Sequence, residues 1–172
     1  MFSHDEVFKG GDGHISKASV ALLGGLQLKP IEGVGIRFPK GEQVFVGYGK
    51  GYLLKYSITK KTVEYDFGKI LNHEITTLET TFDKKRLFLT DSSKELCCEY
   101  KISTGKRISK FGIRKPAVCV LTGDNQFLIT AEYGRYSKLS KWFIQSKQLV
   151  HEWKSDINES VKVMNCTHDN KY

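Results

Sequence analysis

Residues 75–111 read ITTLETTFDKKRLFLTDSSKELCCEYKISTGKRISKF, and this stretch decides the fold class. It holds four short runs, at 75–78, 87–90, 96–100 and 106–111, in which apolar, β-branched and aromatic residues gather. Asp, Ser, Gly and Lys residues separate the runs, as is typical of turns between strands. This pattern predicts four consecutive antiparallel strands, and we therefore expect an all-β chain.

Two flanking segments, 33–67 and 117–153, repeat this order of strands and turns. An aromatic residue closes the third strand of each segment at spacings of 44 and 42 residues, namely Tyr56, Tyr100 and Trp142. The second strands are expected to begin in a matching phase, at Val44, Leu87 and Phe127. A period of about 40–45 residues is typical of β-propeller blades. The alternative is a two-sheet β-sandwich, which also uses short, evenly spaced strands; the recurrence favours blades.

The second segment resembles a repeat of the WD-repeat β-propeller family. Residues 71–75 (LNHEI) resemble the Gly-His dipeptide before a blade's first strand, 82–85 (FDKK) the usual turn, and 100–106 (YKISTGK) the Trp-Asp position and the turn after it. The resemblance extends over about residues 33–153. It implies blades of four antiparallel strands that pack against one another.

The resemblance also implies a domain organisation. Residues 33–172 would form WD-repeat-like blades, with three complete ones at 33–67, 75–111 and 117–153 and the start of another at 161–164. The Gly-rich segment 1–32 could supply part of a further blade. Because complete propellers have at least four blades, we expect an incomplete ring. Such a ring would expose blade edges and apolar faces, which favour association.

Composition narrows the function classes. The chain of 172 residues carries 27 Lys and Arg against 19 Asp and Glu, a net charge of +8 with a pI near 9.2. The cations form short groups at expected turns rather than one tract, so a nucleic-acid or ribonucleoprotein-binding module is the alternative and not the leading reading. The first residues do not resemble a secretory signal, and no apolar run is long enough to cross a membrane. We expect an intracellular, cytoplasmic protein.

Motifs for catalysis are scarce. No Gly-Lys pair is followed by Ser or Thr, which excludes a P-loop, and the histidines and carboxylates show no metal-ligand spacing. The four cysteines lack a C-x-x-C spacing and are expected to be buried, reduced thiols, with Cys97 and Cys98 on opposite faces of a strand. The chain is therefore predicted to be neither an enzyme nor a cofactor- or metal-binding protein.

The remaining prediction is recognition of other proteins. The resemblance implies a non-catalytic scaffold within a larger intracellular assembly, whose partners are proteins and could include a chain that supplies the missing blades. In the family, partners commonly contact loops between the second and third strands. Aromatic and cationic residues in the matching loops are the predicted anchors, because Tyr and Arg are enriched in binding hot spots: Tyr48, Lys50, Arg135 and Tyr136.

Overall fold

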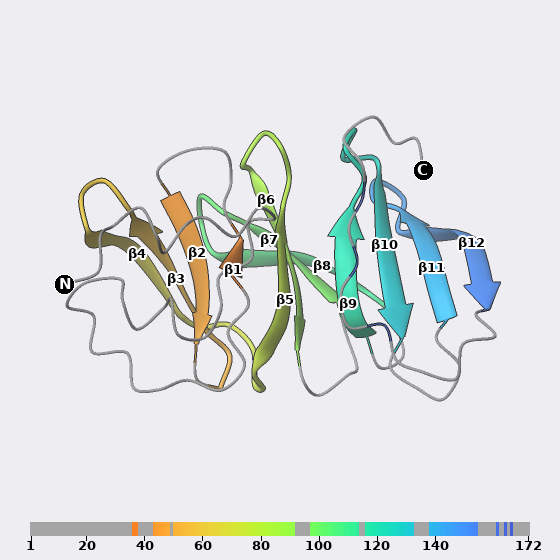
Figure 1. Ribbon diagram of the computed structural model, residues 1–172, viewed down its shortest axis with the longest axis horizontal. Coiled ribbons are helices and arrows are strands. Elements are labelled where there is room, and N and C mark those ends of the chain that lie inside the picture. Colours follow the sequence, from red (N-terminus) through yellow and green to blue (C-terminus); the bar gives the residue numbers. More distant parts are fainter. Residues whose placement is uncertain are drawn as a thin grey trace. The chain divides into compact units, whose positions relative to one another are not determined.

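A computed structural model describes residues 36–37, 43–48, 50–91, 97–113, 116–132 and 138–154, with residues 161, 164 and 166. These residues form strands joined by turns, and no helix occurs among them (Figure 1). The strands make three sheets, each of four strands in antiparallel order. The all-β prediction is confirmed. None of the sheets closes into a barrel.

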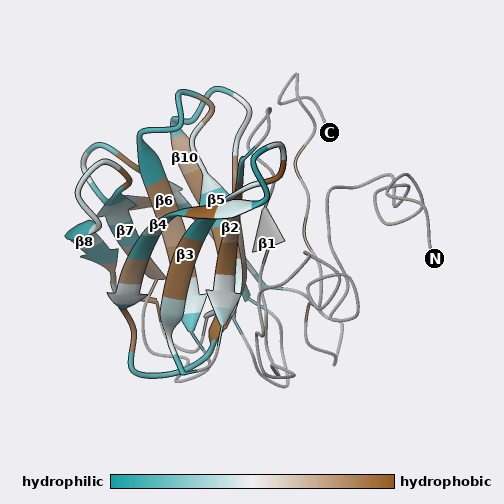
Figure 2. Ribbon diagram, turned by 90° about the vertical axis from the view of Figure 1, so that its left-hand side faces the viewer, coloured by the Kyte–Doolittle hydropathy of each residue, from teal (hydrophilic) through white to brown (hydrophobic). Residues whose placement is uncertain are grey.

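The first sheet belongs to a compact unit that spans residues 1–75. Its strands are β1 (Ile36–Arg37), β2 (Gln43–Tyr48), β3 (Tyr52–Ser57) and β4 (Thr62–Lys69). Hydrophobic residues lie in the middle of β2 and β3 (Figure 2). Val44 and Phe45 point to opposite faces of β2, and their exposed fractions are 0% and 2%. Both faces of this sheet are therefore buried at its centre.

The second unit spans residues 76–172 and contains the other two sheets, apart from the first residue of β5. One sheet is made of β5 (Ile75–Thr80), β6 (Arg86–Asp91), β7 (Cys97–Lys101) and β8 (Lys106–Phe111). The other is made of β9 (Pro116–Leu121), β10 (Phe127–Glu132), β11 (Lys138–Phe143) and β12 (Gln148–Lys154).

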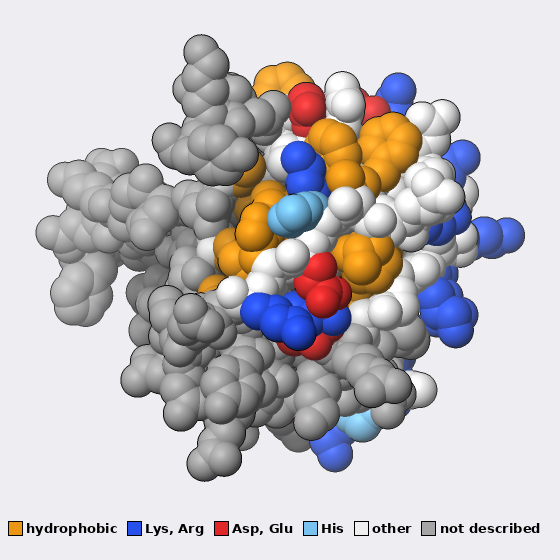
Figure 3. Space-filling model, turned by 90° about the vertical axis from the view of Figure 1, so that its right-hand side faces the viewer, with side chains coloured by type: hydrophobic (Ala, Val, Ile, Leu, Met, Phe, Trp, Pro, Cys, Tyr) orange, Lys and Arg blue, Asp and Glu red, His pale blue; other side chains and the backbone are white. Residues whose placement is uncertain are grey.

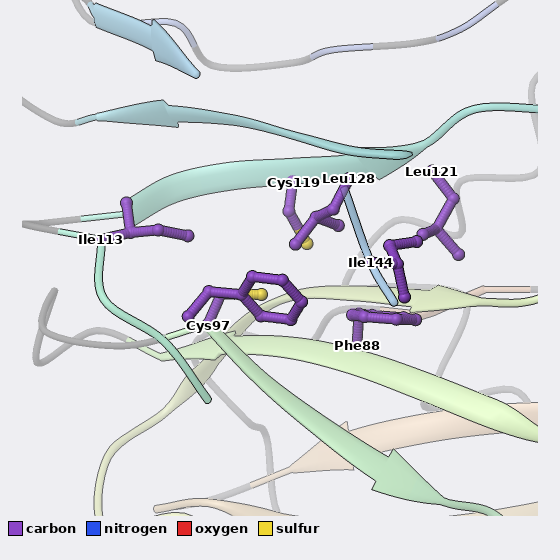
Figure 4. Packing of buried hydrophobic residues seen from close by; sticks show 8 residues of the cluster. Phe88, Cys97, Ile113, Cys119, Leu121, Leu128 and Ile144 are labelled. Atoms are coloured by element: carbon purple, nitrogen blue, oxygen red, sulfur yellow. The ribbon is translucent and has the colours of Figure 1, made fainter. Parts of the chain in front are cut away.

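These two sheets pack face to face around one hydrophobic core (Figure 4). The β5–β8 sheet contributes Phe88, Cys97 and Phe111, and the β9–β12 sheet contributes Cys119, Leu121 and Leu128, with Ile113 and Ile144 at the ends. The Trp142 ring packs on the core edge-on to Phe111, with ring centroids 6.1 Å apart, and its Nε1 donates to Thr130 Oγ1 (3.1 Å). Burial of this apolar surface is the main force that holds the two sheets together.

The turns β5–β6 and β9–β10 are built alike, 41 residues apart. In the first, Thr81 Oγ1 donates to Asp83 Oδ1 (2.6 Å) and accepts from the Arg86 amide (3.0 Å). In the second, Thr122 and Asp124 make the same short bond (2.6 Å). The turns also touch, because the Phe82 amide donates to Asn125 Oδ1 (3.1 Å). Neighbouring repeats are thus joined at this end by a polar contact as well as by the core.

The repeat is also visible between the third and fourth strands of each sheet. The register between third and fourth strands shifts immediately before an aromatic residue in all three sheets, at Tyr56, Tyr100 and Trp142. The turn after it places a residue in the left-handed region each time, and these residues are Lys61 (φ 55°), Gly105 (φ 64°) and Lys147 (φ 60°). The spacings of 44 and 42 residues predicted from the aromatic residues are confirmed.

The predicted starts of the second strands hold to within one residue: β10 begins at Phe127, as predicted, and β2 and β6 begin one residue before Val44 and Leu87. The three predicted residues are not equivalent in pairing. Val44 pairs with Tyr56 and Leu87 with Tyr100, but Trp142 pairs with Leu128 and not with Phe127. Leu128 is fully buried in the core. Phe127 is the counterpart of the polar residues that begin β2 and β6, and its ring lies on the opposite face from Leu128.

Other predictions fall outside the described residues. Nothing tests the expected partial blade at 1–32. Of residues 161–164, Val161 and Met164 are described and lie outside strands, so the start of a further blade stays a prediction. Among the described residues no helix could span a membrane.

Candidate functional site

Two of the four predicted anchors, Arg135 and Tyr136, lie outside the described residues. The other two belong to the β2–β3 turn. Tyr48 ends β2 and its ring lies 5.4 Å from that of Tyr52, which is the more exposed of the pair, while Lys50 projects into solvent. Burial, followed by the negative charge of Asp66, raises the pKa of the Tyr48 hydroxyl. The turn therefore presents a tyrosine pair beside a cation.

The backbone of this turn is fixed by Gly51. The Gly51 carbonyl accepts hydrogen bonds from the amides of Ile70 (2.9 Å) and Leu71 (3.1 Å), which follow β4. Gly51 has a φ of +85°, and a Cβ at this position would lie 2.1 Å from the Leu71 carbonyl oxygen. Only glycine fits such a close approach in the left-handed region. The turn is consequently held against the segment after β4.

The sequence did not predict a second surface, which we call the outer face: the side of the β9–β12 sheet opposite the hydrophobic core. It includes six side chains that are half-buried or exposed, namely Phe127, Ile129, Leu139, Lys141, His151 and Trp153. Val120 and Ala131 lie on the same face and are at most 2% exposed. The six side chains share one side because Lys141 pairs with both Ile129 and His151, and Leu139 pairs with Trp153. In Figure 3 hydrophobic side chains lie around a histidine and a basic side chain on the side of the molecule where β12 lies.

Aromatic contacts organise the outer face. The Lys141 ammonium lies 4.1 Å from the centroid of the Phe127 ring, and the His151 and Trp153 rings meet edge-on at 4.4 Å. Trp153 is 40% exposed. Part of the large apolar surface of its indole, whose burial would be favourable, therefore stays in contact with water. A cation and a half-exposed tryptophan on one apolar surface are a combination that protein interfaces favour.

The outer face repeats a face that is covered in the preceding sheet. In the β5–β8 sheet Phe88 pairs with Glu99, and the equivalent pair in the β9–β12 sheet is Ile129 with Lys141. Likewise Cys97 pairs with Phe111, and the equivalent pair is Leu139 with Trp153. The two faces differ sharply in burial. Phe111 is 1% exposed because the β9–β12 sheet covers it, whereas its counterpart Trp153 is 40% exposed.

The charged residue at the centre of each face differs in whether it has a partner of opposite charge. Glu99 is buried, and it accepts hydrogen bonds from Arg86 Nη1 (3.3 Å) and Ser109 Oγ (2.6 Å). In the first sheet Lys55 holds this place and pairs with Glu64 (3.2 Å). Among the described residues no carboxylate lies within ion-pair distance of Lys141, and its charge acts on Asp124 at longer range.

An ion-pair cluster lies at the end of the same sheet, on its other side. Lys138 Nζ contacts Glu152 (2.6 Å) and Glu132 (3.5 Å), so it connects β11 with both of its neighbours. The hydrogen bond that Lys138 donates to Glu152, together with the charge of Glu132, raises the pKa of Lys138 against the opposing effect of burial. This cluster satisfies its own charges and stabilises the strand order.

The described residues offer no cluster of metal ligands, and their strand cysteines are buried. No group of three or more His, Cys, Asp or Glu side chains among them could hold a metal ion. Cys97, Cys98 and Cys119 are buried thiols, as predicted, whereas Cys166 is only partly buried. Cys98 lies on the opposite face from the core residue Cys97. Burial, then the neighbouring Cys97, raises the pKa of the Cys98 thiol, which disfavours the reactive thiolate.

Comparisons with known proteins address the fold. No protein-family model matches the chain, and no curated protein matches it. Among solved structures, it is similar to a chain of the Kuenenia stuttgartiensis hydrazine synthase with a TM-score of 0.65 and 11% sequence identity. The match covers 79% of this chain and 38% of that chain. This likeness shows a shared fold, and since 936 solved chains match, the fold does not select one activity.

Proposed function

We propose that this chain is a non-catalytic protein–protein interaction scaffold of the WD-repeat β-propeller type, built from blade-like repeats that form an incomplete ring, and that it acts inside a larger intracellular assembly. The observation that carries the proposal is the outer face, an apolar surface with a central cation in a position that the preceding repeat buries. An apolar sheet face of this kind marks a site of protein association.

The repeat supports the propeller reading. Three kinds of feature recur at spacings of 41 to 44 residues. They are the two similar Thr-Asp turns, the three register shifts at aromatic residues and the three left-handed turn residues. This is the period of propeller blades. In repeat architectures each unit buries its faces against its neighbours, as the two sheets of the second unit do.

Affinity purification tests the scaffold function. The tagged full chain is purified from cells that express it, after nuclease treatment, at low and at high salt. The proposal expects a protein partner that stays bound at high salt, because an apolar interface depends little on ionic strength. Recovery of the chain alone under both conditions would contradict it.

A basic nucleic-acid-binding module is the second candidate, and one observation favours it. The β7–β8 hairpin presents Lys101, Lys106 and Lys110 to solvent, and no described carboxylate forms an ion pair with them. Phosphate contacts by such cations give affinity that falls steeply with salt. Binding of a single-stranded RNA at about 50 mM and about 200 mM salt would decide between the two. If a few phosphates are contacted, the nucleic-acid-binding candidate predicts that the affinity falls about tenfold or more over this range, whereas the scaffold predicts weak binding at both salt concentrations.

A further inference from the structure

We infer that the chain begins a fourth repeat after β12, in which residues 161–166 pack on the outer face over β10 and residues 167–171 form a turn that contacts the β9–β10 turn. This goes beyond the proposed function, because it describes how the chain covers part of its own outer face and holds for any partner. Four observations support it: the burial along the outer face, the described residues after β12, the path of the chain in the second unit, and a third copy of the Thr-Asp turn in the sequence.

Burial along the outer face decreases from β9 to β12. Val120 on β9 and Ala131 on β10 are at most 2% exposed, whereas Trp153 on β12 is 40% exposed. Side chains stand roughly perpendicular to a sheet, so they keep contact with water unless something packs on that face. Another part of this chain therefore covers the β9–β10 side of the outer face.

Three apolar residues after β12 are in place to supply this cover. Val161, Met164 and Cys166 lie outside strands and are partly buried, and they belong to the same compact unit as the β9–β12 sheet. Val161 lies seven residues beyond Lys154, the end of β12, and seven residues span at most about 25 Å. Since β10 lies two strand spacings, or about 10 Å, from β12, the segment can reach it.

The path of the chain between the two sheets of the second unit predicts where the segment packs. After β8, the last strand of its sheet, the chain begins the next sheet with β9, which packs against the second strand β6. The second strand of the following sheet is β10, so the equivalent segment after β12 packs against β10. Val161 follows Pro116, the first residue of β9, by 45 residues, which matches the period of the repeat.

The burial of single residues agrees with this alignment. Cys119 and Leu121 belong to the core, on the side of β9 that faces the preceding sheet. Met164 and Cys166 hold their places 45 residues later, and both are partly buried. A segment over β10 also leaves Trp153 two strands away, so its exposure is expected.

The sequence after this segment repeats the Thr-Asp turn a third time. The three turns read TFDKK at 81–85, TGDNQ at 122–126 and THDNK at 167–171. In the first two, the threonine hydroxyl donates to the aspartate two residues further on, at 2.6 Å in each case. Residues 167–171 lie outside the described residues, and their sequence predicts the same turn.

The contact between neighbouring turns then predicts a specific hydrogen bond. The Phe82 amide of the first turn donates to Asn125 Oδ1 of the second (3.1 Å). Gly123 and Asn170 hold the same two places in the second and third turns. The Gly123 amide is therefore expected to donate to the Asn170 side chain, which would join the fourth repeat to the third.

Photo-cross-linking tests the packing in the unaltered sequence. The chain contains two methionines, Met1 and Met164, so growth on photo-methionine places a diazirine at these positions alone. On irradiation the diazirine loses nitrogen, the carbene inserts into a neighbouring C–H or O–H bond, and mass spectrometry locates the product. We expect Met164 to be joined to Ile129, which holds the place of Phe88, or to a residue beside it on the outer face. Insertion into the β5–β8 sheet, the first unit or a second copy, or into water alone, would overturn the inference.

Amide hydrogen exchange measured by NMR tests the turn, with a matched control inside the chain. Asn170→Ala is expected to accelerate exchange of the Gly123 amide roughly fivefold or more. Asn125→Ala, at the contact that the structure contains, is the control and should accelerate exchange of the Phe82 amide by a similar factor. Absence of a Gly123 response to Asn170→Ala would overturn the inferred turn, whether or not Phe82 responds to the control.

Neither measurement depends on a protein partner, so this inference and the proposed function can fail separately. If both results are as expected, the β9–β10 side of the outer face is covered by the chain itself. The proposed protein contact is then confined to the β12 side of that face, where His151 and Trp153 are exposed.

Discussion

Replacement of Gly51 by alanine should destabilise the first sheet far more than replacement of Gly68, although both glycines have positive φ. At Gly68 (φ +67°) an added Cβ meets nothing within 4 Å. A left-handed alanine costs about 1–2 kcal/mol, and the reduced freedom of the unfolded chain offsets about 0.4–1 kcal/mol of that. The expected net loss for Gly68→Ala is therefore about 0.5–1 kcal/mol.

Gly51→Ala carries the same conformational cost and a steric one. Its Cβ would lie 2.1 Å from the Leu71 oxygen and 2.9 Å from the His73 oxygen, so the backbone must move apart. That movement strains packing by about 1–3 kcal/mol and weakens the two hydrogen bonds to the Gly51 carbonyl, worth about 1 kcal/mol each. The expected loss is about 3–5 kcal/mol.

Urea unfolding followed by far-ultraviolet circular dichroism measures both variants. Tryptophan fluorescence is unsuitable as the main signal, since Trp142 and Trp153 both lie in the second unit. The reasoning predicts a gap of at least about 2 kcal/mol between the variants, because the conformational cost they share cancels. A gap below about 0.5 kcal/mol would refute the close approach of Gly51 to the segment after β4.

Three further results are expected. Lys147→Gly should stabilise the chain by about 0.5–1 kcal/mol and Gly105→Lys should destabilise it by a similar amount in thermal melts, since both residues hold the same left-handed turn position; changes of equal sign would contradict the equivalence of the turns. Phe111→Ala should cost about 3–5 kcal/mol and Trp153→Ala about 1 kcal/mol or less in urea unfolding, because one ring is covered and its counterpart is open; equal costs would mean that the outer face is packed. The hydrogen bond from the neighbouring Thr81 hydroxyl lowers the pKa of Asp83 against the opposing effect of burial, so the folded-state pKa lies below the unfolded one: this carboxylate contributes stability above the ordinary Asp range, and the contribution is lost as the pH falls through that range toward the folded pKa. Asp83→Asn keeps an oxygen acceptor, and stability measured between about pH 5 and about pH 3 should fall less steeply in this variant than in the unaltered chain; identical slopes would exclude the effect.

The order and type of the strands could be predicted from sequence because strands and turns differ in composition. Alternation of apolar residues with Gly, Asp and Ser clusters marks local structure, and the aromatic residues Tyr56, Tyr100 and Trp142 mark the repeat. Phe127 begins β10 as predicted, but it is not the pairing equivalent of Val44 and Leu87, because two apolar residues are consecutive there and each could have faced the core. Pairing with Trp142 selects Leu128.

The candidate surface could not be predicted in the same way. Ile129, Leu139 and Trp153 have the composition of any half-buried strand, and only the packing of the sheets shows which face is covered. The alignment of the repeats did contain a usable signal. Lys141 falls at the position of Glu99, and comparison of the strands around each would have shown that the glutamate has hydrogen-bond partners on the neighbouring strands, whereas the described residues give the lysine no ion pair.

Acrylamide quenching of single-tryptophan variants tests most directly the central claim that one face of the β9–β12 sheet packs on the β5–β8 sheet while Trp153, on the other face, is exposed to solvent. Trp142→Phe leaves Trp153 as the reporter of the outer face, and Trp153→Phe leaves Trp142, which packs on Phe111 and donates to Thr130. In the isolated chain the account predicts that Trp153 is quenched several times more strongly and emits at longer wavelength than Trp142. Equal quenching, or stronger quenching of Trp142, would contradict it.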